Sequence, residues 1–151
     1  WQNGANWRNS MTVLVTDTGF ATDDWSHGFV PQSEAANDVT ALDVASDADV
    51  TNLIATLSGV VMIRIDFPSF ADGRGFTLAR QLRLAGFTGR LRARGHVISD
   101  QYAMARRSGF DEVEISDELA ERQPQEDWVS RANWQSHDYQ ARMRQRGKNS
   151  A

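Results

Sequence analysis

Two loops that follow predicted strands carry the side chains best suited to chemistry. The first begins where an apolar run over residues 60–67 reaches Asp66, and it continues into an Asp-Gly-Arg-Gly sequence directly before a helical pattern. Two glycines around an arginine at the start of a helix place backbone N–H groups and a guanidinium near one point, which suits an anion. We therefore predict that a phosphate, sulfate or carboxylate binds to Asp72, Gly73, Arg74 and Gly75. The alternative is a tight loop in which Asp72 caps the helix and Arg74 forms a surface ion pair.

The second loop, residues 95–101, contains the histidine with the clearest position. His96 follows Gly95 at the end of a predicted strand. Histidine is the side chain that titrates closest to neutral pH, so it suits proton transfer. With Asp66 as the base and His96 as the acid, the pair predicts a hydrolase or lyase. The alternative for Asp66 is an ion pair with Arg64, Arg74 or Arg92.

Other side chains carry weaker signals. Asp100 and Gln101 stand in the first turn of a predicted helix, where such residues either bind a ligand or cap the helix. The three histidines have no clear acidic partners, so no metal site is predicted. No nucleophile-elbow pattern surrounds Ser69, which argues against serine catalysis. The absence of cysteine excludes thiolate metal sites, disulfides and cysteine nucleophiles.

The elements that position these loops alternate along the chain. Strands are predicted over 11–16, 60–67, 90–94 and 112–115, with shorter ones within 20–25 and 39–44. Helices are predicted from an N-cap at Ser46 to Leu57, over 76–85, and from a cap at Ser99 to Gly109. This alternation predicts one α/β domain with a parallel sheet, either open or a partial barrel. In such sheets ligands bind at the carboxyl ends of the strands, where loops 66–75 and 95–101 lie.

The chain also divides by composition. Residues 1–10 have no periodicity and are predicted to be an extension, residues 11–137 to be the domain, and residues 138–151 to be a basic, disordered tail. Residues 117–137 are predicted to be helical with an interruption at Pro124. The chain has no membrane-spanning run and no signal peptide, which favours a cytoplasmic protein without a membrane partner.

Charge is unevenly distributed around the net value of -4. Residues 9–63 contain eight acids and no Lys or Arg, whereas residues 62–110 contain nine arginines and three acids. An arginine-rich segment can bind anions or an acidic partner. The alternative is that the acidic first third neutralises it within the molecule. Because the net charge is negative and no aromatic–basic motif occurs, nucleic acid is not predicted as a partner.

A long motif resembles a known bacterial family. It comprises IDFPSFADGRGFTLAR at residues 65–80, GFTGRLRA at 86–93, Asp100-Gln101, and SGFDE at 108–112. The family has no assigned function; its members are encoded beside assimilatory sulfite reductase and are described as probable oxidoreductases of sulfite reduction. The resemblance covers residues 45–116, with a weaker fit over 11–25. The recurring polar positions of the family match Asp66, Asp72, Gly73, Arg74, Gly75, Arg92, Gly95, Asp100 and Gln101.

Two departures from the family pattern bear on the chemistry. The family has Val-Gly-Asp where this chain has Arg94-Gly95-His96, and it often has Cys where Ser108 stands. The resemblance implies an accessory protein or oxidoreductase component of sulfite reduction. Such a protein would bind a small anion or dock to sulfite reductase or another redox protein. An adaptor without catalytic activity and the Asp66–His96 hydrolase or lyase are the alternatives. No cofactor motif and no signal for an oligomeric state is present.

Overall fold

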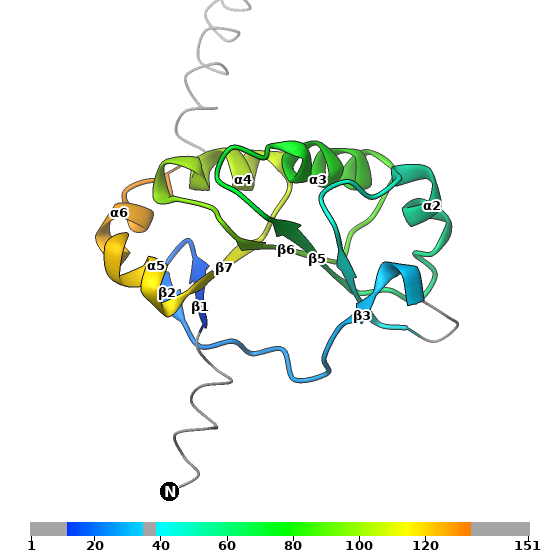
Figure 1. The fold of residues 1–151 in the computed structure, drawn as a ribbon, viewed down its shortest axis with the longest axis horizontal. Coiled ribbons are helices and arrows are strands. Elements are labelled where there is room, and N and C mark those ends of the chain that lie inside the picture. The colour runs from blue at the N-terminus through cyan, green and yellow to red at the C-terminus, as the bar shows by residue number, and fades with distance from the viewer. Residues whose placement is uncertain (1–11, 35–38, 134–151) are drawn as a thin grey trace, which may run out of the picture.

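The computed structural model describes residues 12–34 and 39–133. The predictions for the extension at residues 1–10 and the tail at residues 138–151 lie outside this part of the chain. The described residues form a mixed α/β domain around one sheet (Figure 1).

The sheet is open and mostly parallel, as the alternation of elements predicts. Its seven strands lie in the order β2-β1-β7-β6-β5-β4-β3. Strands β3 to β7 are mutually parallel, while β1 runs antiparallel to β7 and to β2. The strands are β1 (Thr12–Thr16), β2 (Gly19–Ala21), β3 (Val30–Pro31), β4 (Ala41–Val44), β5 (Met62–Phe67), β6 (Arg90–Gly95) and β7 (Glu112–Ser116).

The helices that connect the parallel strands cover one face of the sheet. In Figure 1, α2, α3 and α4 lie side by side above the strands, and α5 and α6 close the end beside β1 and β2. Two short 3₁₀ helices, η1 (Gln32–Glu34) and η2 (Ser99–Gln101), precede β4 and α4. The α-helices are α2 (Val50–Ala55), α3 (Arg74–Leu84), α4 (Tyr102–Ser108), α5 (Asp117–Arg122) and α6 (Gln125–Val129).

The apolar core lies between these helices and the sheet. Alternate residues of β5 and β6, including Ile63, Ile65 and Leu91, are fully buried there. They form one cluster with Leu78 and Leu82 of α3. Because side chains alternate along a strand, the residues between them point to the opposite face.

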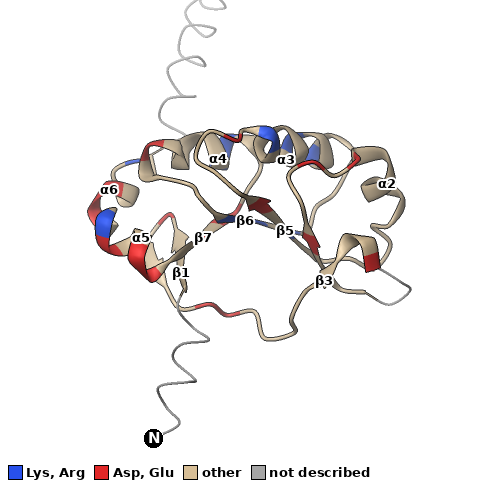
Figure 2. Cartoon of the chain, in the orientation of Figure 1, with Lys and Arg blue, Asp and Glu red and all other residues tan. Residues whose placement is uncertain are grey.

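That opposite face of the sheet is charged rather than apolar. The register aligns Asp43, Arg64, Arg92 and Glu112 across four neighbouring strands. Residues 22–29, which we call the strap, connect β2 to β3, the two outermost strands. Figure 1 shows the strap passing beneath the sheet, and Figure 2 shows acidic residues on it and basic residues on β5 and β6.

Three predicted helix starts need correction. Asp49, not Ser46, caps α2, since its side chain accepts from Thr51 N. Helix α3 begins at Arg74 rather than at residue 76, so Arg74 and Gly75 form its first turn. Ser99 does not cap α4; its Oγ donates to Gln123 Oε1 at 2.7 Å, and η2 intervenes.

Other predicted boundaries are confirmed. Helix α4 ends at Gly109, whose φ of 117° suits glycine. Pro124 separates α5 from α6.

Candidate functional site

The two predicted loops meet at the carboxyl edge of the sheet. The Gln101 side-chain amide donates to the Phe70 carbonyl at 3.0 Å, and the His96 backbone N–H donates to the Phe67 carbonyl at 2.9 Å. The His96 and Phe70 rings meet edge to face, with centroids 5.0 Å apart. The loop after β5 and the loop after β6 are therefore joined by both backbone and side-chain contacts.

Gly95 permits this close approach. Its φ is 112°, and a Cβ at this position would lie 2.8 Å from the Phe67 carbonyl oxygen. A side chain here would be strained by the backbone and would collide with β5. The backbone thus turns at Gly95 and brings His96 against the end of the neighbouring strand.

A pocket of about 180 Å³ opens at this edge. It is lined by Phe70, Gly95, His96, Ser116, Leu119 and Arg122. Sequence reasoning placed Gly95 and His96 at this edge but missed Ser116 and Arg122. Only the fold brings the last turn of α5, with Arg122, beside the end of β6, and no local pattern indicates this.

The pocket contains one titratable side chain, His96, and one cationic side chain, Arg122, and both have few partners within the molecule. His96 Nδ1 lies 3.2 Å from the Phe67 carbonyl oxygen. Because a carbonyl only accepts, Nδ1 is the donor in this contact. Within residues 12–34 and 39–133, no carboxylate lies within ion-pair distance of Arg122.

The glycine loop has the geometry of its predicted alternative. Arg74 donates to Asp72 from its backbone N, from Nε at 3.0 Å and from Nη2 at 2.7 Å. The Ser46 hydroxyl donates to the same carboxylate at 3.0 Å. The hydrogen bonds from Arg74 hold the pKa of Asp72 well below its usual range. The Asp72 carboxylate therefore occupies the guanidinium that we predicted for an external anion, and binding at this loop stays a prediction.

The remaining predicted site residues do not lie together in the structure. Asp66 lies 3.4 Å from Arg94 Nη2, instead of pairing with Arg64, Arg74 or Arg92. Asp100 pairs with Arg131 at 2.6 Å on the surface.

Arg92 lies on the charged face of the sheet and pairs there with Glu112, Glu114 and Asp23. Among the described residues, no hydrogen bond or ion pair joins it to the glycine loop. Arg92 and the Asp-Gly-Arg-Gly loop are thus separate features.

The acid–base pair of the hydrolase hypothesis is not in contact. Asp66 accepts a hydrogen bond from Arg94, while His96 Nδ1 is hydrogen-bonded to the Phe67 carbonyl oxygen. No hydrogen bond joins Asp66 to His96 in the described part of the chain. The described residues also contain no group of three or more His, Cys, Asp or Glu side chains that could hold a metal ion.

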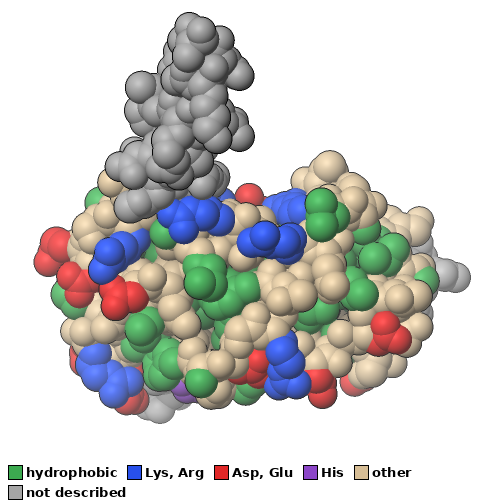
Figure 3. Space-filling view, turned by 90° about the horizontal axis from the view of Figure 1, so that it is seen from above, with side chains coloured by type: hydrophobic (Ala, Val, Ile, Leu, Met, Phe, Trp, Pro, Cys, Tyr) green, Lys and Arg blue, Asp and Glu red, His purple; other side chains and the backbone are tan. Residues whose placement is uncertain are grey.

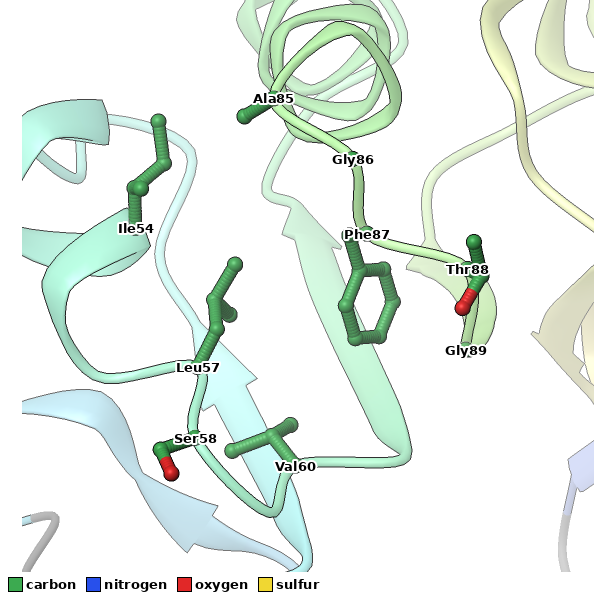
Figure 4. Close-up of a pocket in the computed structure, with 9 residues that line it drawn as sticks. All are labelled: Ile54, Leu57, Ser58, Val60, Ala85, Gly86, Phe87, Thr88 and Gly89. Atoms are coloured by element: carbon green, nitrogen blue, oxygen red, sulfur yellow. The ribbon is translucent and has the colours of Figure 1, made fainter.

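A second hollow lies at the opposite, amino-terminal edge of the sheet. It has a volume of about 410 Å³, and Leu57, Val60 and Phe87 point into it between α2 and α3 (Figure 4). No charged side chain lines it. It therefore offers a ligand no charged side chain and no acid–base group.

Most arginines of the basic segment form ion pairs within the molecule. Those that pair with the acidic first third, as the second interpretation predicts, are Arg64, Arg90, Arg92 and Arg106. Asp43 binds Arg64, and Asp23 and Asp24 bind Arg92 and Arg90. These acids all come from the acidic first third. The cationic groups left for a ligand are few, which makes the carboxyl-edge pocket stand out.

Fold and site together define an open α/β protein with a small polar pocket at the carboxyl edge of its sheet. The chain belongs to the family described as bacterial protein of unknown function (DUF934), which matches residues 41–148. Neither the curated proteins nor the solved structures contain a match. In the described residues, no helix combines the length and the apolar character needed to cross a bilayer.

Proposed function

We propose that the protein binds a small oxyanion in the carboxyl-edge pocket and serves as an accessory component of assimilatory sulfite reduction. The observation that carries the first half is that His96 and Arg122 line the same pocket, and that Arg122 has no carboxylate within ion-pair distance among the described residues. An arginine binds an oxyanion through several N–H groups at once. When both ring nitrogens of His96 carry a proton, Nε2 adds another donor.

The size of the pocket favours a small ion over a cofactor. Its volume is about 180 Å³, whereas pockets for drug-sized ligands span about 300–1,000 Å³. Phe70 and Leu119 form its apolar part, which lowers the local dielectric and strengthens a charge-assisted hydrogen bond. Sulfite, sulfate and phosphate all have the required charge and several acceptor oxygens.

The link to sulfite reduction depends on the motif at residues 65–80 and its resemblance to proteins encoded beside sulfite reductase. The family description itself names no substrate. Sulfite is therefore the first ligand to test, with sulfate and phosphate as comparisons.

Thermal shift and isothermal titration of the full chain test this proposal. A ligand at 100 times its dissociation constant adds about 2.7 kcal/mol to the unfolding free energy, which for a domain of this size raises Tm by about 5–10 °C. We expect Arg122→Gln to abolish the rise. Arg80→Gln is the matched control, because Arg80 is an exposed arginine of α3 that does not line the pocket.

Three outcomes separate the possible sites. A rise lost in Arg122→Gln and kept in Arg80→Gln supports the pocket. A rise lost in Arg74→Ala and kept in Arg122→Gln places the anion at the glycine loop. No rise with any of the three anions rejects small-anion binding.

The second candidate is docking to sulfite reductase or another redox protein through the outer face of the helix layer. Leu84 of α3 is 81% exposed and Met104 of α4 is 52% exposed. Figure 3 shows hydrophobic and basic side chains interspersed over this face. Co-purification with the reductase, lost in Leu84→Glu and kept in Glu118→Gln on α5, would support it. Equal co-purification by both variants would reject this surface.

A further inference from the structure

The strap is attached to the charged face of the sheet by carboxylates and one aromatic ring. Asp23 Oδ2 lies 3.0 Å from Arg92 Nη1, and Asp24 Oδ1 lies 2.5 Å from Arg90 Nη2. The Phe29 ring lies over Arg64, with its centroid 3.8 Å from Cζ. These contacts bridge the sheet from β6 to β5.

Beneath the strap, one guanidinium nitrogen lacks a hydrogen-bond acceptor. Arg92 has no exposed side-chain surface, and its Nη2 is buried without a hydrogen-bond partner. The nearest carboxylate oxygen, Asp24 Oδ1, is 3.8 Å away, beyond hydrogen-bond distance. Its other nitrogens are satisfied, since Nε donates to Glu112 at 2.6 Å and Nη1 to Glu114 at 2.9 Å. A buried donor without a partner is costly, so this group favours a further acceptor.

The strap lies at the surface and has few kinds of attachment to the sheet. None of residues 22–29 is buried, and the Asp24 side chain is 65% exposed. Its attachments are ion pairs and a cation–π contact rather than apolar packing, which places it among the segments that open most easily. The three arginines beneath it are balanced by Asp43, Glu112 and Glu114. Short directional contacts therefore hold the strap.

We propose that this face is a second oxyanion site, in which Asp23 and Asp24 occupy the positions of the oxygens of an external ligand. When the strap moves aside, Arg90 and Arg92 present N–H groups that these two carboxylates now occupy. Asp24 Oδ1 stays 3.8 Å from Arg92 Nη2, whereas an oxyanion has additional acceptor oxygens, one of which satisfies that nitrogen as well. The strap is then a competing internal ligand, and binding requires its release. This site is separate from the carboxyl-edge pocket and does not depend on it.

Sulfate binding to the full chain and to strap variants tests the proposal. The double variant Asp23→Asn/Asp24→Asn keeps an acceptor oxygen at each position but removes the competing charges. We expect it to bind sulfate about five- to tenfold more tightly than the native chain by isothermal titration. Adding Arg90→Gln to the double variant should remove the gain. The matched control, Glu126→Gln/Asp127→Asn, changes the same charge on exposed positions of α6 and should bind as the native chain does.

Hydrogen exchange of the native chain gives an independent measurement. Sulfate should accelerate amide exchange in residues 22–29 relative to sodium chloride at equal ionic strength, because the ligand displaces the strap rather than screening it. Unchanged or slower exchange there overturns the proposal, as does unchanged affinity in the folded double variant. The gain in affinity should also survive Arg122→Gln. Its loss in that background would place the ion in the carboxyl-edge pocket and reject the second site, without affecting the proposed function.

Discussion

Neighbouring residues of β6 show how differently the two faces of the sheet are held. Leu91 points into the apolar cluster beneath the helices, while Arg92 points to the face beneath the strap. Both side chains are fully buried. Leu91 is stabilised by apolar burial, which has no preferred direction. Arg92 is stabilised by ion pairs, and their contribution to stability depends on every partner being present. The two faces should therefore respond differently to mutation, acid and salt.

The largest effect should follow from breaking the charged network. Arg92→Met fills a similar volume but leaves Glu112 and Glu114, each 5% exposed, without this cation. Removing one partner of a buried pair costs about 3–5 kcal/mol, measurable as a lower free energy of unfolding in urea. The triple variant Arg92→Met/Glu112→Gln/Glu114→Gln should recover part of this loss. If it is no more stable than the single variant, unpaired carboxylates are not the cause.

A slightly smaller effect is expected on the apolar face. Leu91→Ala should lower the free energy of unfolding by about 2–5 kcal/mol, because it removes buried methyl groups and leaves a cavity under the helices. The loss should be the same at low and high salt. Val61→Ala, at a position 52% exposed, is the control and should change stability by less than about 0.5 kcal/mol. A strong salt dependence of the stability loss in Leu91→Ala would contradict the difference between an apolar face and a charged face.

Acid should weaken the strap before the core. Burial alone would raise the pKa of Asp23, but hydrogen bonds from Arg92 and from the Trp25 backbone lower it overall. The hydrogen bond from Arg90 lowers the pKa of Asp24. A lowered pKa in the folded state gives stability that is present above the unfolded value of about 3.9 and lost as pH falls below it through the folded value.

Urea unfolding between pH 6 and pH 3 measures this contribution. The native chain should lose more stability on acidification than Asp23→Asn/Asp24→Asn, by up to about 1 kcal/mol, since both carboxylates are partly exposed. Asp72 has a lowered pKa as well but is present in both proteins, so the difference reports on the strap. Identical pH profiles would show that the strap carboxylates contribute nothing to folding.

Salt should produce the smallest effect and the most local one. Raising sodium chloride from 0.1 M to 1 M shortens the Debye length from about 10 Å to about 3 Å, which weakens partly exposed ion pairs. Amide exchange should accelerate modestly in residues 22–29 and stay unchanged in β5 and α3. Equal acceleration in both regions would mean that the strap opens only when the domain unfolds.

Much of the fold was predictable from local patterns. The apolar runs and glycine stops indicated β4 to β7 and α4 with small boundary errors, but not β3, because periodicity and capping depend on residues close in sequence. The antiparallel placement of β1 beside β7 was not predictable, since Val13 and Ile115 pair across most of the chain. The helix starts at Ser46 and Ser99 were wrong because tertiary partners, Asp72 and Gln123, take those hydroxyls.

The candidate site was predictable only in part. Gly95 and His96 could be placed at the carboxyl edge because parallel strands end at one side of a sheet. Arg122 could not, since it reaches the pocket from a later helix.

The amino-acid sequence by itself determined the alternation of strands and helices and the surplus of arginine in the middle of the chain. Only the tertiary structure decided what those arginines do. Arg92 meets an acid 69 residues earlier, and Arg90 one 66 residues earlier. Pairing over such separations depends on how the whole sheet is assembled, so no local pattern specifies which guanidinium is neutralised and which is left for a ligand.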